Sequence, residues 1–231
     1  MLKLMRSVLS ARDFIISQPG IFKLLSASCT FSFVLLVVRI FVTGSLFYAF
    51  LAWNLFLAFI PFAVTTFMFR RKEFKTNSVK FLFLFSVWLL FVPNAFYIIT
   101  DLFHLDEGTL APQWFDLILI FSFAWNGLLA GIISMIQMER LIESYLSGRV
   151  KWLFLYFIMF LNALGIYIGR YLRYNSWDII TNPFQLAKDI AYLCIHPMRN
   201  SNDWGMIFCF AVLMTLIYKS FESINNSIAY K

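Results

Sequence analysis

The sequence predicts an all-α protein, a polytopic bundle of about six transmembrane helices with both termini on the cytoplasmic side. Three observations support this fold class. Hydrophobic residues make up 61% of the 231 residues and charged residues only 13%, whereas soluble domains carry about 25% charged residues. The apolar residues occur in runs of about 20, the length needed to cross a bilayer. The basic residues gather in alternate connections between these runs.

The first expected element is an amphipathic helix within residues 1–20, lying on the membrane surface. Its basic residues are Lys3, Arg6 and Arg12. Pro19 and Gly20 form a strong helix stop behind it. Because no long apolar run lies close to the start, we expect no cleaved signal peptide. Residues 21–231 then form a single transmembrane domain.

Six runs within this domain are long and apolar enough to cross a bilayer. The last run is the shortest. The expected spans are residues 24–43, 45–69, 79–100, 115–137, 151–171 and 204–221.

The orientation follows from the placement of Lys and Arg, which concentrate in cytoplasmic loops. If six spans are correct, fourteen of the 19 basic residues lie on one side, together with both termini. The other side holds Arg170, Arg173, Lys188 and Arg199, with Arg39 near the outer end of the first span. The net charge of +7 therefore indicates topology and contact with anionic lipid head groups. It does not indicate nucleic-acid binding.

The third span carries polar groups that hydrocarbon penalises. If this stretch is helical, Asn94, Tyr97, Asp101 and His104 fall within an arc of roughly 80°. One helix face therefore changes from apolar to polar toward the outer side of the membrane.

Other polar residues converge on the same outer half of the membrane. We expect them to form a polar pocket with the third span, open to the outer face. They are Arg39, Asn54, Asp116, Asn126, Arg170, Arg173, Asn175 and Asp178. On the fourth span, Asp116, Asn126, Ala130, Ser134 and Gln137 share one arc, and on the fifth Gly165 and Gly169 provide a site of close helix approach.

Each of these features has a simpler interpretation. Single asparagines such as Asn54 and Asn126 more often hydrogen-bond neighbouring helices than ligands. Arg39 could extend outward to the head groups. Asp101 could form a structural ion pair with Arg170. Arg170 and Arg173 could be ordinary interfacial anchors, but two arginines within one turn beside Asp178 favour an ion-pair network.

The candidate chemistry centres on Asp101 and His104. Their i,i+3 spacing lets Asp101 orient His104 as a general base. Asp101, His104 and Asp116, completed by Asp178 or His196, could hold a metal, but no dense ligand motif is present and we predict neither a metal nor a cofactor. Cys29, Cys194 and Cys209 show no metal-binding or redox spacing and are interpreted as small apolar residues.

The only long connection is the outer loop of residues 179–203. Residues 183–195 predict a short interfacial helix, which is either a lid over the outer mouth or a passive surface helix.

Four segments together resemble a bacterial family of uncharacterised multi-pass membrane proteins, the domain of unknown function numbered 1361. The segments are Trp53-Asn54 with Pro61, residues 88–105, residues 114–127 and residues 169–178. Phe96 departs from the family pattern, in which we expect Pro. The resemblance implies a protein of several helices in the bacterial cytoplasmic membrane and supplies no activity.

Three functions are compatible with these residues. The first is binding or movement of a lipid head group or a small polar or anionic ligand. The second is an intramembrane enzyme acting on a lipid or lipid-linked substrate, with Asp101 and His104 as acid/base groups or metal ligands. The third is a structural or accessory membrane subunit. The sequence leaves the oligomeric state open.

Overall fold

The computed structural model describes residues 19–70, 78–105, 107, 110–143, 146 and 148–229. Within these residues it is helical, without strands, and six of its helices are long and apolar enough to cross a membrane. The predicted fold class is confirmed. The amphipathic helix expected before Pro19 lies outside the described residues.

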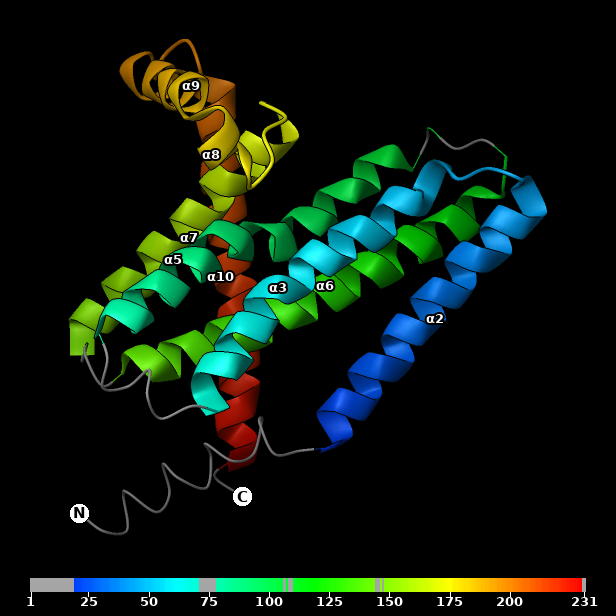
Figure 1. Cartoon of the computed structure of the whole chain (residues 1–231), viewed down its shortest axis with the longest axis horizontal. Coiled ribbons are helices and arrows are strands. Elements are labelled where there is room, and N and C mark those ends of the chain that lie inside the picture. The colour runs from blue at the N-terminus through cyan, green and yellow to red at the C-terminus, as the bar shows by residue number, and fades with distance from the viewer. Residues whose placement is uncertain are drawn as a thin grey trace.

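The six candidate spans agree closely with the predicted ranges (Figure 1). The last helix is longer than predicted, and two short helices fill the connection before it. In chain order the elements are α2 (Pro19–Thr43), η1 (Phe47–Ala49), α3 (Phe50–Arg70), α5 (Ser78–Tyr97), η2 (Ile98–His104), α6 (Gln113–Ile142), α7 (Gly148–Arg170), α8 (Asp178–Thr181), α9 (Pro183–Ile195) and α10 (Ser201–Ala229).

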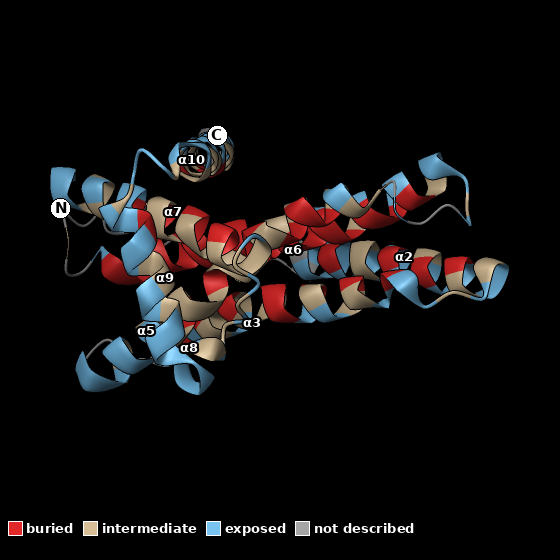
Figure 2. Ribbon diagram, turned by 90° about the horizontal axis from the view of Figure 1, so that it is seen from above, coloured by how far each residue is buried: buried red, intermediate tan, exposed pale blue. Residues whose placement is uncertain are grey.

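Helix α6 is the centre of the bundle, and it packs against α2, α3, α5 and η2. Figure 2 shows buried residues along α6 and exposed ones over α8 and α9. The predicted polar arc of α6 is buried along its length, with Asp116, Asn126, Ser134 and Gln137 each at most 2% exposed. The helix continues past the predicted end to Ile142, and in this extension the buried carboxylate of Glu139 accepts a hydrogen bond from Tyr218 of α10.

Helix α5 lies close to both α6 and α7 because glycines face it. A Cβ added at Gly131 of α6 would lie 2.8 Å from the Ala95 side chain, and one at Gly165 of α7 would lie 2.7 Å from the Pro93 ring. Real Cβ atoms essentially never approach so closely. The close-approach site predicted at Gly165 therefore exists, and α5 is the neighbour.

The sequence interpretation assumed that the third span is α-helical to its end, but it is not. It tightens after Tyr97 into the 3-10 helix η2. In a 3-10 helix residues three apart eclipse each other, so Ile98, Asp101 and His104 lie in one line. The change of helix type therefore keeps Asp101 and His104 on one side of η2.

The outer surface of the bundle is apolar where a membrane would cover it. Phe41 and Val42 of α2 are 85% and 75% exposed, and α10 exposes Phe208 and Val212. Exposed apolar surface of this extent is typical of proteins that contact lipid. The chain is an integral membrane protein.

Candidate functional site

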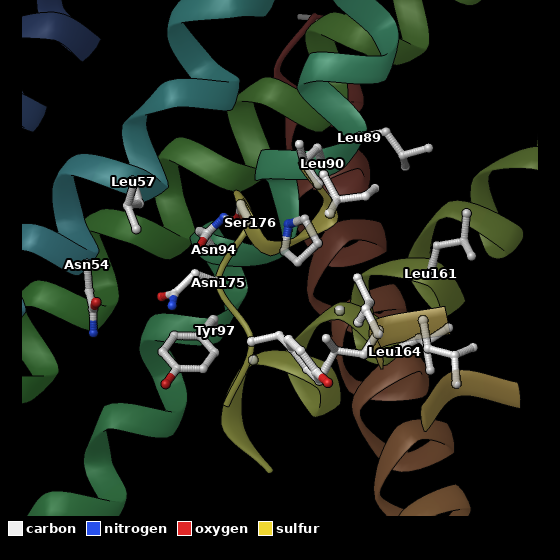
Figure 3. A pocket seen from close by; sticks show the side chains of 18 of the residues that line it. Asn54, Leu57, Leu89, Leu90, Asn94, Tyr97, Leu161, Leu164, Asn175 and Ser176 are labelled. Carbon is white, nitrogen blue, oxygen red and sulfur yellow. Dashed lines mark hydrogen bonds between the residues drawn. The ribbon is translucent and has the colours of Figure 1, made fainter. Parts of the chain in front are cut away.

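A pocket of about 520 Å³ lies between α3, α5 and α7 and reaches the 174–176 segment and α9. Figure 3 shows its polar side chains on one side and leucines of α5 and α7 on the other. The polar residues on the first side include Asn54, Asn94, Tyr97, Asn175 and Ser176, and Tyr174 and Ser86 also line the pocket. The apolar lining includes Leu89, Leu90, Leu161, Leu164 and Ile168. Among the described residues that line this pocket, none is Asp, Glu, Lys, Arg or His.

The turn after α7 brings the polar residues of the 171–178 segment over the pocket. Arg173, three residues beyond the end of α7, lies in the left-handed region with a φ of 62°, a conformation uncommon for residues other than Gly. The amide of Tyr174 donates back to Ile168 O at 3.2 Å. Ser176 then accepts a 3.0 Å hydrogen bond from Asn94 Nδ2, which joins the turn to α5.

The ion-pair network expected for Arg170, Arg173 and Asp178 is not formed among the described residues. Arg173 is exposed. The Asp178 carboxylate instead accepts hydrogen bonds from the Asn175 amide at 2.6 Å and the Thr181 hydroxyl at 2.8 Å. These hydrogen bonds hold the pKa of Asp178 below its usual range. Asp178 therefore fixes the turn that carries Asn175, and the network interpretation was wrong.

A second group of polar residues surrounds Asp101, which is 1% exposed. Asn54 Nδ2 donates to Asp101 Oδ2 at 2.8 Å. Arg170 Nη1 lies 4.0 Å from Asp101 Oδ1 and 2.9 Å from His104 Nε2. His104 Nδ1 lies 2.6 Å from Glu107 Oε2. Residues of α3, η2 and α7 thus meet at one point, as the sequence predicted for Asp101, His104 and Arg170.

These contacts define the tautomer of His104. Arginine has no acceptor, so His104 Nε2 must accept the hydrogen bond from Arg170. The imidazole proton is then on Nδ1 and is donated to the Glu107 carboxylate. Both ring nitrogens are occupied, which leaves no lone pair free to take a proton from a substrate.

A third group is the ion pair between Arg39 of α2 and Asp116 of α6. Arg39 Nε and Nη2 donate to the two Asp116 oxygens at 2.9 and 3.1 Å, and each residue is 1% exposed. The guanidinium carbon lies 4.5 Å from the centre of the Tyr48 ring. Arg39 therefore does not extend outward to the head groups, as one interpretation allowed.

Tyr48 connects the second and third groups, because its hydroxyl donates to His104 O at 3.0 Å. The two ion pairs are nevertheless distinct from the pocket. Neither Asp116 nor Asp101 lines it, and Asn54 provides the link between Asp101 and the pocket wall. The polar residues predicted as one pocket thus divide into three neighbouring groups.

The metal set considered from the sequence is not assembled. Asp116 is bound by Arg39, and His196 Nδ1 lies near Tyr192 O at the end of α9. Within the ranges that the structure describes, no three His, Cys, Asp or Glu side chains are grouped to hold a metal. Asn126 lies away from the pocket and donates to Ser32 of α2 at 2.9 Å, which is the helix-to-helix role expected of a single asparagine.

The sequence interpretation missed the apolar half of the pocket and one buried network. The leucines of α5 and α7 give the same signal whether they face lipid, core or pocket. In the network, Ser134 accepts from Trp88 at 2.7 Å, and Thr65 donates to Gln137 at 2.6 Å. The small and polar periodicity of α6 indicated Ser134 and Gln137, but no signal paired them with Trp88.

A family model described as "Protein of unknown function (DUF1361)" matches residues 53–217. The chain belongs to this family. Searches of curated proteins and of solved structures give no match. Every lining residue of the pocket lies within the family domain, as do Asp101, Asp116 and Arg170. Helix α2 with Arg39 precedes the matched residues.

Proposed function

We propose that this protein binds an amphiphilic lipid from the outer leaflet of a bacterial cytoplasmic membrane. The observation that carries the proposal is the division of the pocket into a polar side at Asn94, Asn175 and Ser176 and an apolar side of leucines. A ligand that fits both sides must itself have a polar head and an apolar chain.

Size and accessibility support this proposal. A volume of about 520 Å³ lies within the usual range for small-molecule sites, about 300–1,000 Å³, and suits a head group with part of a chain. Ser86 and Trp53 line the pocket and are exposed. The pocket is therefore open on the side where the apolar surfaces of α3 and α5 would meet lipid.

The outward orientation rests on the charge distribution. The 171–200 connection at the pocket carries few basic residues, whereas the opposite ends of the helices carry most of them. Basic residues concentrate in cytoplasmic loops. The pocket therefore opens toward the outer leaflet in this proposal.

The contacts of His104 favour binding over the enzymatic alternative. A general base needs a free lone pair within reach of its substrate, and both nitrogens of His104 are engaged by Arg170 and Glu107. Asp101 is buried behind Asn54. In this proposal, Asp101, His104 and Arg170 position the end of α7 against η2 and α3.

Photo-crosslinking tests the proposal. Protein in phosphatidylcholine nanodiscs is irradiated with a lipid that carries a photoreactive acyl chain, and the labelled residues are mapped by mass spectrometry. We expect labelling of α7 at residues 161–168 that is lost in Leu164→Trp, which fills the pocket. The control is Leu153→Trp on the 70% exposed lipid-facing side of the same helix, which should leave this labelling intact. Equal labelling in both variants would contradict the proposal.

A further inference from the structure

We infer that the pocket selects an uncharged lipid whose head group donates hydrogen bonds, a hydroxylated amphiphile, in preference to an anionic phospholipid. This inference rests on the proposed function and specifies its ligand. It departs from the anionic ligand that Arg170 and Arg173 suggested in the sequence.

The argument starts from three asparagines at the polar side. Each directs its amide nitrogen to a group that can only accept: Asn54 to the Asp101 carboxylate, Asn94 to Phe91 O and Asn175 to the Asp178 carboxylate. An acceptor of this kind fixes the orientation of the amide, because only the NH₂ group can donate to it.

The amide oxygens are consequently among the atoms left for a ligand. No hydrogen bond to the Oδ1 atom of Asn54, Asn94 or Asn175 occurs within the described residues. The Tyr97 hydroxyl lines the same side of the pocket and can both donate and accept. The polar side therefore presents three amide oxygens that only accept, beside the Tyr97 and Ser176 hydroxyls, which can also donate, and no charged residue lines it within the part of the chain that the structure describes.

A phosphodiester would leave these amide oxygens without a donor. Its free oxygens only accept, and it carries a negative charge whose removal from water is costly without a paired cation. No arginine lines the pocket among the described residues, and Arg170 donates to His104 and lies over the Phe103 ring at 5.3 Å. A hydroxyl group, in contrast, donates to an amide oxygen and adds no charge.

Hydroxyl donors could come from two kinds of uncharged lipid. Diacylglycerol presents a single hydroxyl, and a glycosylated diacylglycerol presents several on a sugar. The first can donate to the amide oxygen of Asn94 or of Asn175 and the second can donate to both, and the experiment separates them.

The test is competition against the photoreactive lipid at residues 161–168, in phosphatidylcholine nanodiscs. Unlabelled dioleoylglycerol, glucosyl-dioleoylglycerol and dioleoylphosphatidylglycerol are added in turn. We expect at least one uncharged lipid to compete at a mole fraction about tenfold lower than the anionic lipid, about 1.4 kcal/mol in binding free energy. The stronger of the two uncharged competitors identifies the head group.

Two variants sharpen the result. Tyr97→Phe removes a hydroxyl from the polar side and should weaken the uncharged competitor about three- to tenfold, the effect of one hydrogen bond. Its control is Tyr171→Phe, the same change at an exposed tyrosine beyond α7. Ser176→Lys adds a cation to the polar side and should shift the preference toward phosphatidylglycerol.

The outcomes separate this inference from the proposed function. Equal or stronger competition by phosphatidylglycerol in the unmodified protein would overturn the inference, while labelling that depends on Leu164 would still support lipid binding. Labelling that no added lipid reduces, and that Leu164→Trp does not abolish, would overturn both.

Discussion

Arg39 of α2 and Asp116 of α6 form a two-point ion pair in which each residue is 1% exposed. The pair lies against the Tyr48 ring and connects the first span to the centre of the bundle. Because α2 precedes the family domain, this contact joins an N-terminal helix to that domain. Ser32, which accepts from Asn126, is a second polar contact between the same two helices.

Breaking one side of this pair should destabilise the protein strongly. Removal of one partner from a buried ion pair leaves an uncompensated charge and costs about 3–5 kcal/mol. We expect Arg39→Met and Asp116→Leu each to lower the melting temperature in detergent markedly. The double variant should be more stable than either single variant, because it leaves no unpaired charge. Arg199→Met, at an exposed arginine, is the control, and a double variant less stable than both singles would contradict the role of the pair.

Two glycine-to-alanine changes should act in opposite directions. In open helical positions Ala is favoured over Gly by about 1 kcal/mol. Nothing lies within 4 Å of a Cβ added at Gly205 of α10, so Gly205→Ala should be neutral or stabilising. At Gly165 the Cβ would lie 2.7 Å from the Pro93 ring, and overpacking of this kind typically costs about 1–3 kcal/mol. Thermal unfolding of both variants measures the difference, and equal stability would show that α5 and α7 can separate without cost.

The attachment of α9 to the turn after α7 should weaken at alkaline pH. The Tyr174 hydroxyl donates to Asp189 Oδ2 at 2.7 Å, and this hydrogen bond raises the pKa of Tyr174. The contact therefore contributes fully below the ordinary tyrosine pKa of about 10 and is lost as the pH rises through the raised value. Absorbance titration of tyrosinate, compared with Tyr174→Phe, identifies this group. Asp189→Asn should return its pKa toward the ordinary value, and an unchanged titration would contradict the contact.

Hydropathy and charge predicted the helices because a bilayer imposes their length and sidedness. The same topology placed Asp101 near Arg170, and the structure brings them to 4.0 Å. The sequence could not predict which helix faces meet. Arg39 could extend to the head groups or pair with Asp116, and only the packing of α2 on α6 distinguishes these two possibilities. The sequence around Leu164 is likewise the same whether this leucine faces lipid, the core or the pocket. Polar residues on a span therefore reveal the polar half of a site in the sequence, whereas the apolar residues of the same site cannot be distinguished from other apolar residues.

Substitution of His104 distinguishes a positioning role from a catalytic one. A glutamine can accept from Arg170 through its oxygen and donate to Glu107 through its nitrogen, so His104→Gln can retain both contacts. We expect His104→Gln to keep the labelling of residues 161–168, and His104→Leu, which can make neither contact, to reduce both this labelling and thermal stability. If His104 were a general base, both variants would instead lose catalytic activity equally. Lipid profiling of a deletion strain complemented with each variant tests the enzymatic alternative. The enzymatic role would be favoured if the unmodified protein corrects a lipid change in this strain and neither variant does, provided that His104→Gln folds normally.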